Sequence, residues 1–167
     1  MHPLGTIPAF KIEPRSFGMD MTYYKRPSEL MVCIVENDEL LRESMVLFFR
    51  TKGCGVQAFG SAEEAFPVME SRPPNIVICD HGLPGMDGLK LLSRFGADHP
   101  DAVKILISAH PSARLAEEAK RAGVDEYLLK PFSIEEIERT LSRRFQSHFD
   151  GGDPSGGTGD VPGEKLA

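Results

Sequence analysis

The sequence predicts a doubly wound α/β fold, in which helices cover both faces of a five-stranded parallel sheet. Short β-prone segments alternate with helical segments five times between residues 30 and 145. The β-prone segments are nearly continuous apolar runs, as is typical of parallel strands that are buried on both faces. Residues that cap helices stand at the start of several intervening segments. These patterns favour a sheet whose strands are joined by crossover helices.

The strands are predicted from their length and composition. Each is a short run of β-branched, aliphatic or aromatic residues, which suit the pleated surface of a buried sheet. The predicted strands are residues 31–35, 56–59, 76–79, 103–107 and 126–129.

The helices are predicted from their capping residues and apolar spacing. Ser61-Ala-Glu-Glu64 and Ser133-Ile-Glu-Glu136 are capping boxes, in which the serine and the last glutamate satisfy exposed backbone N–H groups. Asp38 and Asp87 are the expected N-caps of the first and third helices. In the last helix, apolar residues three or four positions apart predict a stripe that faces the sheet. That stripe consists of Ile134, Ile137, Leu141 and Phe145.

The chain divides into three zones, of which one is a folded domain. Residues 1–29 mix prolines and glycines with isolated aromatics and predict an irregular N-terminal arm. Residues 30–145 contain the alternating pattern and form the expected single domain. Residues 146–167 are rich in glycine, proline and aspartate, so we expect a disordered tail that has little apolar surface to bury.

Composition excludes several functional classes. The formal net charge of −6 argues against nucleic-acid binding, which needs clustered Lys and Arg. No apolar run is long enough to span a bilayer and no signal peptide opens the chain, so we expect a soluble cytoplasmic protein without membrane contacts. Cys33, Cys54 and Cys79 form no CxxC pair, and we expect them to remain reduced.

Polar side chains follow four of the predicted strands. Glu36 and Asn37 follow the first, Asp80 the third, Ser108 the fourth and Lys130 the fifth. In open parallel sheets, ligands bind beyond the carboxyl ends of the strands. Crowded carboxylates need a cation, and hard oxygen ligands suit Mg²⁺. Such an ion and a lysine can hold a phosphoryl group while a carboxylate attacks it.

Residues 31 to about 145 resemble a response-regulator receiver domain of bacterial two-component signalling, the module seen in the chemotaxis response regulator. The strongest piece is residues 75–88, which read Asn-Ile-Val-Ile-Cys-Asp-His-Gly-Leu-Pro-Gly-Met-Asp-Gly. Ile107-Ser108-Ala109 and Tyr127-Leu-Leu-Lys130-Pro131-Phe132 follow it in the family's order. The resemblance implies a flavodoxin-like sheet with strand order 2-1-3-4-5.

The resemblance also implies a phosphoacceptor and a metal site. Asp80 matches the aspartate that accepts a phosphoryl group from a sensor histidine kinase or phosphotransfer protein. Glu36, Asn37 and Asp80 match the side chains that hold Mg²⁺, and Gly82 matches the residue whose backbone carbonyl completes the ligands. We therefore expect a signalling phosphoprotein rather than an enzyme.

The remaining matched residues imply a switch. Lys130 matches the lysine that pairs with the phosphoryl group, and the peptide before Pro131 is cis in the family. Ser108 and Tyr127 match the switch hydroxyl and the aromatic rotamer switch. Phosphorylation would reshape the face made by the fourth helix, fifth strand and fifth helix, which would bind a downstream effector or a second copy of the chain.

Asn37 departs from the family pattern, because the family usually has an acid in that position. A neutral amide oxygen can ligate Mg²⁺ but contributes less charge. The alternative function is therefore a pseudo-receiver that serves as a docking module with weak or no phosphorylation. A haloacid-type phosphatase is disfavoured, because His81 and Gly82 supply no second acid-base carboxylate. We expect neither His81 nor His110 to bind a metal.

Overall fold

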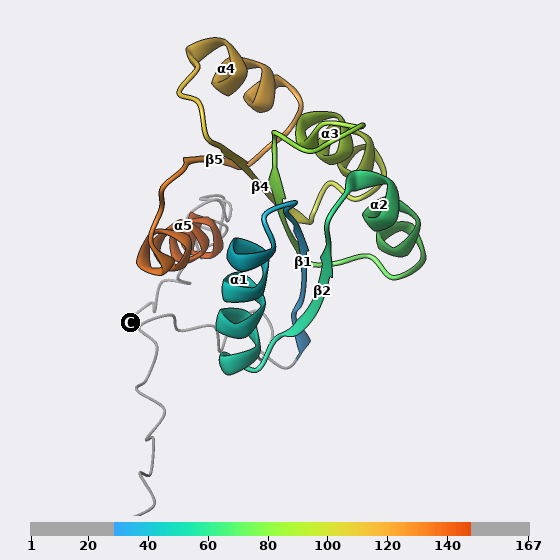
Figure 1. Cartoon of the computed structure of the whole chain (residues 1–167), viewed down its shortest axis with the longest axis vertical. Helices are drawn as coiled ribbons and strands as arrows, with labels where there is room; N and C mark the ends of the chain where they lie inside the picture. The colour runs from blue at the N-terminus through green and yellow to red at the C-terminus, as the bar shows by residue number, and fades with distance from the viewer. Residues whose placement is uncertain (1–28, 148–167) are drawn as a thin grey trace, which may run out of the picture.

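The computed structural model describes residues 29–147, and the predicted N-terminal arm and tail lie almost wholly outside that range. Five strands alternate with five helices along these residues (Figure 1). The strands are β1 Met31–Val35, β2 Gly55–Phe59, β3 Ile76–Asp80, β4 Val103–Ser108 and β5 Glu126–Leu129. The helices are α1 Glu39–Thr51, α2 Ala62–Ser71, α3 Gly88–Asp98, α4 Ala113–Arg121 and α5 Ile134–Ser147.

The strands form one parallel sheet in the order β2-β1-β3-β4-β5. The doubly wound fold and the strand order expected from the sequence are thereby confirmed. The order reverses between β1 and β3, which are hydrogen-bonded neighbours in the middle of the sheet. This reversal opens space beyond the carboxyl ends of those two strands.

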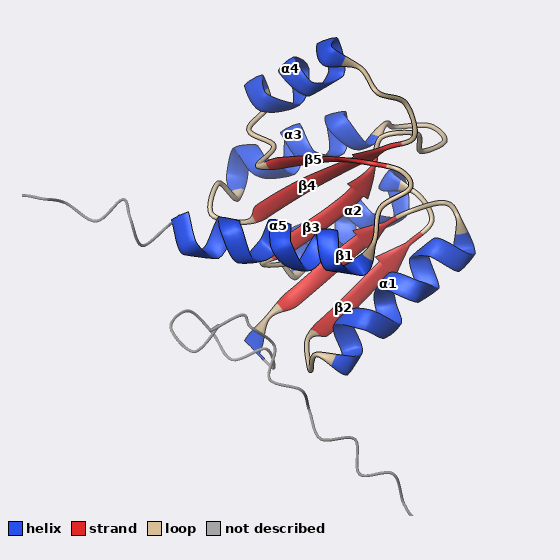
Figure 2. Cartoon of the chain, turned by 90° about the vertical axis from the view of Figure 1, so that its left-hand side faces the viewer, coloured by secondary structure: helices blue, strands red, loops and turns tan. Residues whose placement is uncertain are grey.

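Helices cover both faces of the sheet, and each face has its own apolar core. In Figure 2, α1 and α5 lie in front of the sheet, whereas α2 and α3 lie behind it. Met45 and Phe49 of α1 pack with Ile137 and Leu141 of α5 on the first face. The core of the second face contains buried residues of α2, α3 and α4, among them Met69, Leu91, Leu92, Phe95 and Leu115.

The central strands are apolar at successive positions because they contribute to both cores. In β1, Val32 and Ile34 belong to the core under α1 and α5, whereas Cys33 and Val35 belong to the opposite core. This alternation follows the two-residue period of a strand. Burial raises the pKa of the Cys33 thiol to about 12, so this cysteine remains protonated and packs as an apolar residue.

The helix starts agree with the predicted caps. Asp38 accepts a hydrogen bond from Leu41 N at 2.9 Å, and Asp87 accepts one from Lys90 N at 2.9 Å. The capping box at Ser133 is reciprocal: Ser133 Oγ accepts from Glu136 N, and Glu136 accepts from Ser133 N. These bonds satisfy N–H groups that have no partner within the helix.

Element ends differ slightly from the sequence predictions. Strands β2, β3 and β4 are each one residue longer than predicted. Helix α5 continues to Ser147, so residues 146 and 147 belong to the helix and not to the tail. Element ends depend on single hydrogen bonds, which residue patterns do not resolve. None of the helices within residues 29–147 could span a membrane.

Gly88 lets α3 begin directly against the end of β3. A Cβ atom here would lie 2.8 Å from Sγ of Cys79 and would overlap the backbone carbonyl oxygen of Asp80. Gly88 N donates to the backbone oxygen of His81 at 3.3 Å. The glycine therefore allows the close approach that seats Asp80 at the strand end.

We predict that Gly88→Ala lowers the free energy of unfolding by about 1–3 kcal/mol, because the added methyl group overpacks a buried backbone contact. Urea denaturation of the metal-free protein measures this change. Gly60→Ala is the matched control, since its nearest neighbour would be an Arg42 nitrogen at an ordinary 3.7 Å. Equal stabilities of the two variants would contradict the prediction.

Candidate functional site

Four polar side chains lie at the carboxyl edge of the sheet, each at or just after the end of a different strand. Glu36 follows β1, Asp80 ends β3, Ser108 ends β4 and Lys130 follows β5. Glu36, Asp80 and Ser108 are all at most 5% exposed, although all three are polar. Buried polar groups need partners, so their contacts define the site.

Lys130 joins the two buried carboxylates. Its Nζ lies 2.9 Å from Oε2 of Glu36 and 3.1 Å from Oδ2 of Asp80. The Lys130 side chain is 22% exposed, so the ammonium sits at the mouth of the site. The structure thus brings together the two acids and the lysine ammonium, which the sequence placed at the ends of three separate strands.

Burial and the contacts among these three groups shift the pKa values of Glu36 and Lys130. Desolvation raises the pKa of Glu36, although the Lys130 ammonium and a hydrogen bond from Asp38 N act in the opposite direction. The pKa of Lys130 is also raised: burial lowers it, but its contacts with the Glu36 and Asp80 carboxylates outweigh burial. The pKa values of Glu36 and Lys130 are therefore both raised from their ordinary values.

Asn37 also contacts both carboxylates. In the amide orientation that satisfies hydrogen bonding, Nδ2 donates to Oδ2 of Asp80 at 3.2 Å and to Oε1 of Glu36 at 3.1 Å. The amide nitrogen therefore donates to both acids at once. Ligating a cation through Oδ1 would require the amide to turn over.

Three hydrogen bonds anchor the acids, and one of them comes from Arg42, which the sequence analysis did not single out. Arg42, in the first turns of α1, donates to the backbone oxygen of Glu36 at 2.6 Å. Asp38 N donates to Oε1 of Glu36 at 3.0 Å. The six-residue separation of Arg42 from Glu36 at a helix start is the only sequence signal for this contact. Gly82 N donates to Oδ1 of Asp80 at 3.2 Å, so Gly82 lies beside the acid.

Ser108 and Tyr127 do not contact the acids but share a neighbour in the β4–α4 loop. Oγ of Ser108 lies 3.2 Å from both the backbone nitrogen and the backbone oxygen of His110. The Tyr127 hydroxyl donates to the same His110 oxygen at 3.0 Å, in an exposed position. Both side chains are therefore held to one peptide unit outside the acid cluster.

The turn after β5 carries Lys130 into the site. The Lys130–Pro131 peptide bond is cis. Lys130 N donates to the backbone oxygen of Ser108 at 2.8 Å, which keeps the start of this turn in register with β4. His81 N donates to the Ile107 oxygen at 2.7 Å and extends the pairing of β3 with β4.

Comparison with known families identifies this arrangement. A family model described as the response regulator receiver domain matches residues 32–142. The chain belongs to the response regulator receiver family. Receiver domains of this family belong to two-component systems, and phosphorylation and Mg²⁺ binding are general to them.

The relatives of this receiver domain are regulatory proteins. The transcriptional regulatory protein PmrA of Pectobacterium parmentieri is 34% identical over 120 residues, which cover 70% of this chain and 54% of PmrA. The receiver domain thus spans about half the length of that relative. A LuxR-family DNA-binding response regulator of Staphylococcus aureus is 30% identical, with a TM-score of 0.63; the match covers 68% of this chain and 97% of the solved chain.

A CheY-like receiver domain protein of Methanospirillum hungatei shares the fold. Its TM-score is 0.68 at 23% identity, and the match covers 74% of this chain and 98% of that chain. At this level of identity the likeness supports the architecture, and the roles of individual residues depend on their own geometry.

The oxygen donors of this receiver fit a hard cation such as Mg²⁺. Their total negative charge is lower than in a site with three acids, because Asn37 is neutral. Within residues 29–147, no three His, Cys, Asp or Glu side chains are grouped to hold a metal ion. Glu36 and Asp80 are the two acids, and the Asn37 amide stands beside them. Oε2 of Glu36 is buried and lacks a well-angled hydrogen bond despite its ion pair with Lys130. This oxygen retains capacity to ligate Mg²⁺.

We predict that the Glu36 carboxyl group of the metal-free receiver titrates above the ordinary value of 4.5. Because the folded pKa is raised, its contribution to stability is complete below 4.5 and is lost as pH rises through the folded pKa. Carboxyl-carbon NMR measures the titration. Adding Mg²⁺ should lower the midpoint, since a cation favours the charged form.

The variant Lys130→Met should raise this midpoint further, because the ammonium lowers the pKa of Glu36. Lys90→Met is the control, since the Lys90 ammonium pairs with Asp87 and its side chain is 78% exposed. A Glu36 midpoint at or below 4.5 in the metal-free wild type would contradict the expected effect of burial.

Proposed function

We propose that this receiver is a cytoplasmic phosphoacceptor, which takes a phosphoryl group from a sensor histidine kinase or phosphotransfer protein onto Asp80. It acts as a signalling switch and not as an enzyme in its own right. The observation that carries this proposal is the buried Asp80 carboxylate, held 3.1 Å from the Lys130 ammonium and joined through it to Glu36.

The chain's own groups support transfer to Asp80. A carboxylate oxygen of Asp80 would attack phosphorus, so that an oxygen–phosphorus bond forms while the nitrogen–phosphorus bond of a phosphohistidine breaks. The electron pair of the broken bond returns to the imidazole nitrogen. Lys130 supplies positive charge at the site mouth, where it can hold phosphoryl oxygens.

Glu36, Asn37, Asp80 and the Gly82 backbone carbonyl are the groups that would hold Mg²⁺. When bound, the ion supplies charge that stabilises the transferring phosphoryl group. The chain's contribution is to hold its donors in place: Arg42 and Asp38 N fix Glu36, and Gly82 N fixes Asp80.

The contacts of His110 support a switching role for Ser108 and Tyr127. Both hydroxyls bond the His110 backbone, outside the acid cluster. Drawing Ser108 Oγ toward a phosphoryl group on Asp80 would release one of these bonds. The loop would then shift, and Tyr127 would lose its exposed partner. Because the loop leads into α4, this movement would alter the face formed by α4, β5 and α5.

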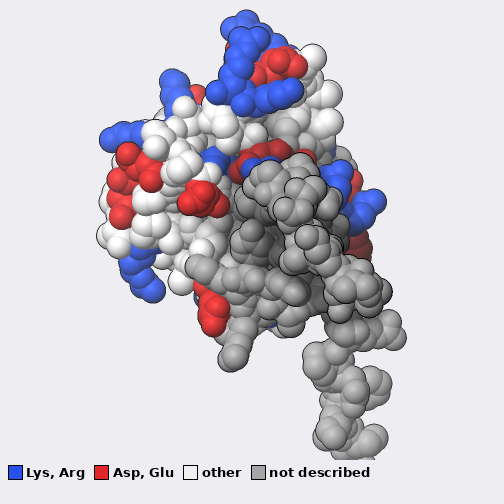
Figure 3. All heavy atoms as spheres, turned by 180° about the vertical axis from the view of Figure 1, so that it is seen from behind, with Lys and Arg blue, Asp and Glu red and all other residues white. Residues whose placement is uncertain are grey.

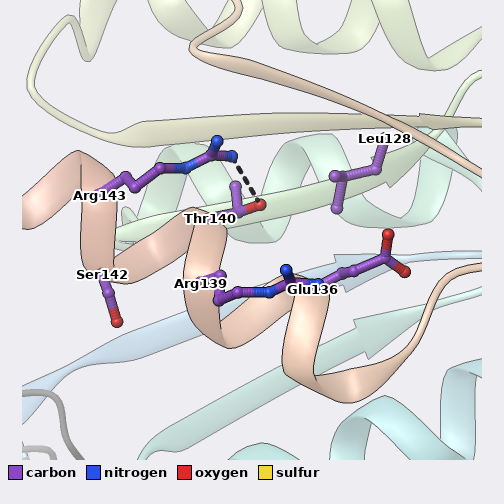
Figure 4. A pocket seen from close by; sticks show the side chains of 6 residues that line it. All are labelled: Leu128, Glu136, Arg139, Thr140, Ser142 and Arg143. Carbon is purple, nitrogen blue, oxygen red and sulfur yellow. Dashed lines mark hydrogen bonds between the residues drawn. The ribbon is translucent and has the colours of Figure 1, made fainter.

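That face carries the features of a docking surface for a downstream effector or a second copy of the chain. Figure 3 shows Lys, Arg, Asp and Glu side chains gathered over α4 at the top of the molecule. Between β5 and α5 lies an open pocket of about 400 Å³ (Figure 4). Its lining consists of Leu128, Glu136, Arg139, Thr140, Ser142 and Arg143.

Asn37 favours a second candidate function, the pseudo-receiver that docks partners without efficient phosphorylation. Because Asn37 replaces an acid, Glu36 and Asp80 are the two acids that remain, and the formal negative charge of the metal ligands is smaller. The Asn37 amide also satisfies both carboxylates without a metal. Each effect lowers the advantage of binding Mg²⁺.

We predict that incubation with Mg²⁺ and acetyl phosphate adds one phosphoryl group to the protein, because Asp80 offers a carboxylate nucleophile next to the Lys130 ammonium. Intact-mass measurement detects the addition, and an acyl phosphate is released by hydroxylamine. Asp80→Asn removes the nucleophile and should abolish labelling. Asp87→Asn is the matched control, since Asp87 caps α3 and should leave labelling intact.

Labelling that persists in Asp80→Asn would disprove the assignment of the phosphoacceptor. A wild-type protein that remains unlabelled at saturating Mg²⁺ would support the pseudo-receiver instead.

We predict that Asn37→Asp tightens Mg²⁺ binding about tenfold to a hundredfold, because it adds one negative charge next to Glu36 and Asp80. Phosphorylation at limiting Mg²⁺ should rise, and wild type should approach the variant when Mg²⁺ is abundant. An NMR titration of amides near Asp80 measures the affinity. Asp38→Asn changes a neighbouring charge that caps α1 and serves as the control. Equal affinities of wild type and Asn37→Asp would refute the proposed role of residue 37.

A further inference from the structure

The β3–α3 loop, residues 81–87, places Gly82 beside Asp80 and is held at several points. Leu83 is buried in the core, and Asp87 caps α3. His81 N bonds to β4 at Ile107, and Gly88 N closes back on the His81 oxygen. Between Leu83 and Asp87, Pro84 and Gly85 are exposed, and Met86 packs against the core under α2 and α3.

Glu63 of α2 supplies such a contact. Oε1 of Glu63 accepts a hydrogen bond from Met86 N at 2.7 Å, across 23 residues of sequence. Gly85, with φ of +75°, lies directly beneath the carboxylate. A Cβ atom at Gly85 would overlap Oε1 of Glu63. Glycine therefore serves twice here: it adopts the positive φ, and it leaves room for the Glu63 carboxylate.

The contact is charge-assisted. The hydrogen bond from Met86 N, followed by one from Glu63's own backbone N–H, lowers the pKa of the Glu63 carboxyl group. The contribution of the charged Glu63 carboxylate to stability is therefore present above the ordinary pKa of glutamate. It is lost as pH falls through the lowered pKa. Ser61 Oγ caps α2 by accepting from Glu64 N, and the contact with Met86 gives the Glu63 side chain a partner outside the helix.

We propose that Glu63 is a positioning residue, which holds the β3–α3 loop through Met86 and thereby keeps the Gly82 carbonyl aligned with Asp80 for Mg²⁺. This inference rests on the proposed function, because it assigns Glu63 a place in the shell that supports the metal ligands. Groups that orient metal ligands commonly change metal affinity by a factor of ten or more when removed. Glu63 is exposed, so we expect a smaller effect.

Three variants test the proposal. Glu63→Ala removes the acceptor, Glu63→Gln keeps an acceptor oxygen without charge, and Glu64→Ala removes the adjacent charge in the same helical turn. Amide hydrogen exchange and the ¹⁵N shift of Met86 report the contact, and Mg²⁺ titration by NMR reports the site. All measurements use the full chain, without a phosphoryl donor.

Glu63→Ala should speed exchange at Met86 and weaken Mg²⁺ binding about threefold to tenfold. Glu63→Gln should restore most of the protection, and Glu64→Ala should match wild type. The Met86 shift should titrate at acid pH in wild type and lose that titration in Glu63→Gln. A purely structural role for α2 would not produce rescue by glutamine together with loss of the titration.

Unchanged Met86 exchange and Mg²⁺ affinity in Glu63→Ala would overturn the proposal, as would an equal loss in Glu64→Ala. Faster exchange at Met86 with unchanged Mg²⁺ affinity would also overturn it, because the contact would then not reach the site. If wild type binds no Mg²⁺, both the proposed function and the metal-positioning role of Glu63 are wrong. The Met86 data would still show separately whether Glu63 holds the loop.

Discussion

Two buried carboxylates meet at the carboxyl edge of this sheet, and the Lys130 ammonium is the cation that holds Glu36 and Asp80 there. Both acids are almost fully removed from water, which would strongly disfavour two unpaired negative charges. Lys130 lies 2.9 Å from one acid and 3.1 Å from the other, and the Asn37 amide bridges them from a second direction. The remaining features of the site depend on this balance of charge.

The fold assembles this cluster because its strands are parallel and their order reverses between β1 and β3. The carboxyl ends of parallel strands lie at the same edge, so the residues at or just after the ends of β1, β3, β4 and β5 come together there. Gly88 lets α3 approach the Asp80 backbone, while Arg42 fixes the peptide of Glu36. The apolar cores on both faces make these positions rigid, since close-packed interiors resist small displacements.

Around the acid cluster, side chains hold two loops in place by hydrogen bonds to backbone groups. One His110 oxygen accepts from both Ser108 and Tyr127, and the Met86 N–H reaches Glu63 on another helix. These contacts hold the β3–α3 loop to α2 and the β4–α4 loop to β4 and β5. Asn37 adds a neutral donor where an acid would increase repulsion, so the metal-free state is better satisfied and the demand for a cation is smaller.

The sequence by itself determined the alternating elements, the caps at Asp38 and Asp87, and the polar residues that end the strands. These features follow from local periodicity and from side chains that bond nearby backbone. Only the tertiary structure decided that Lys130 bridges Glu36 and Asp80, that Ser108 and Tyr127 share the His110 oxygen, and that Glu63 holds Met86. Apart from the local bond between Ser108 and His110, these contacts join residues far apart in the chain, and they depend on strand order and side-chain rotamers, which no local pattern encodes.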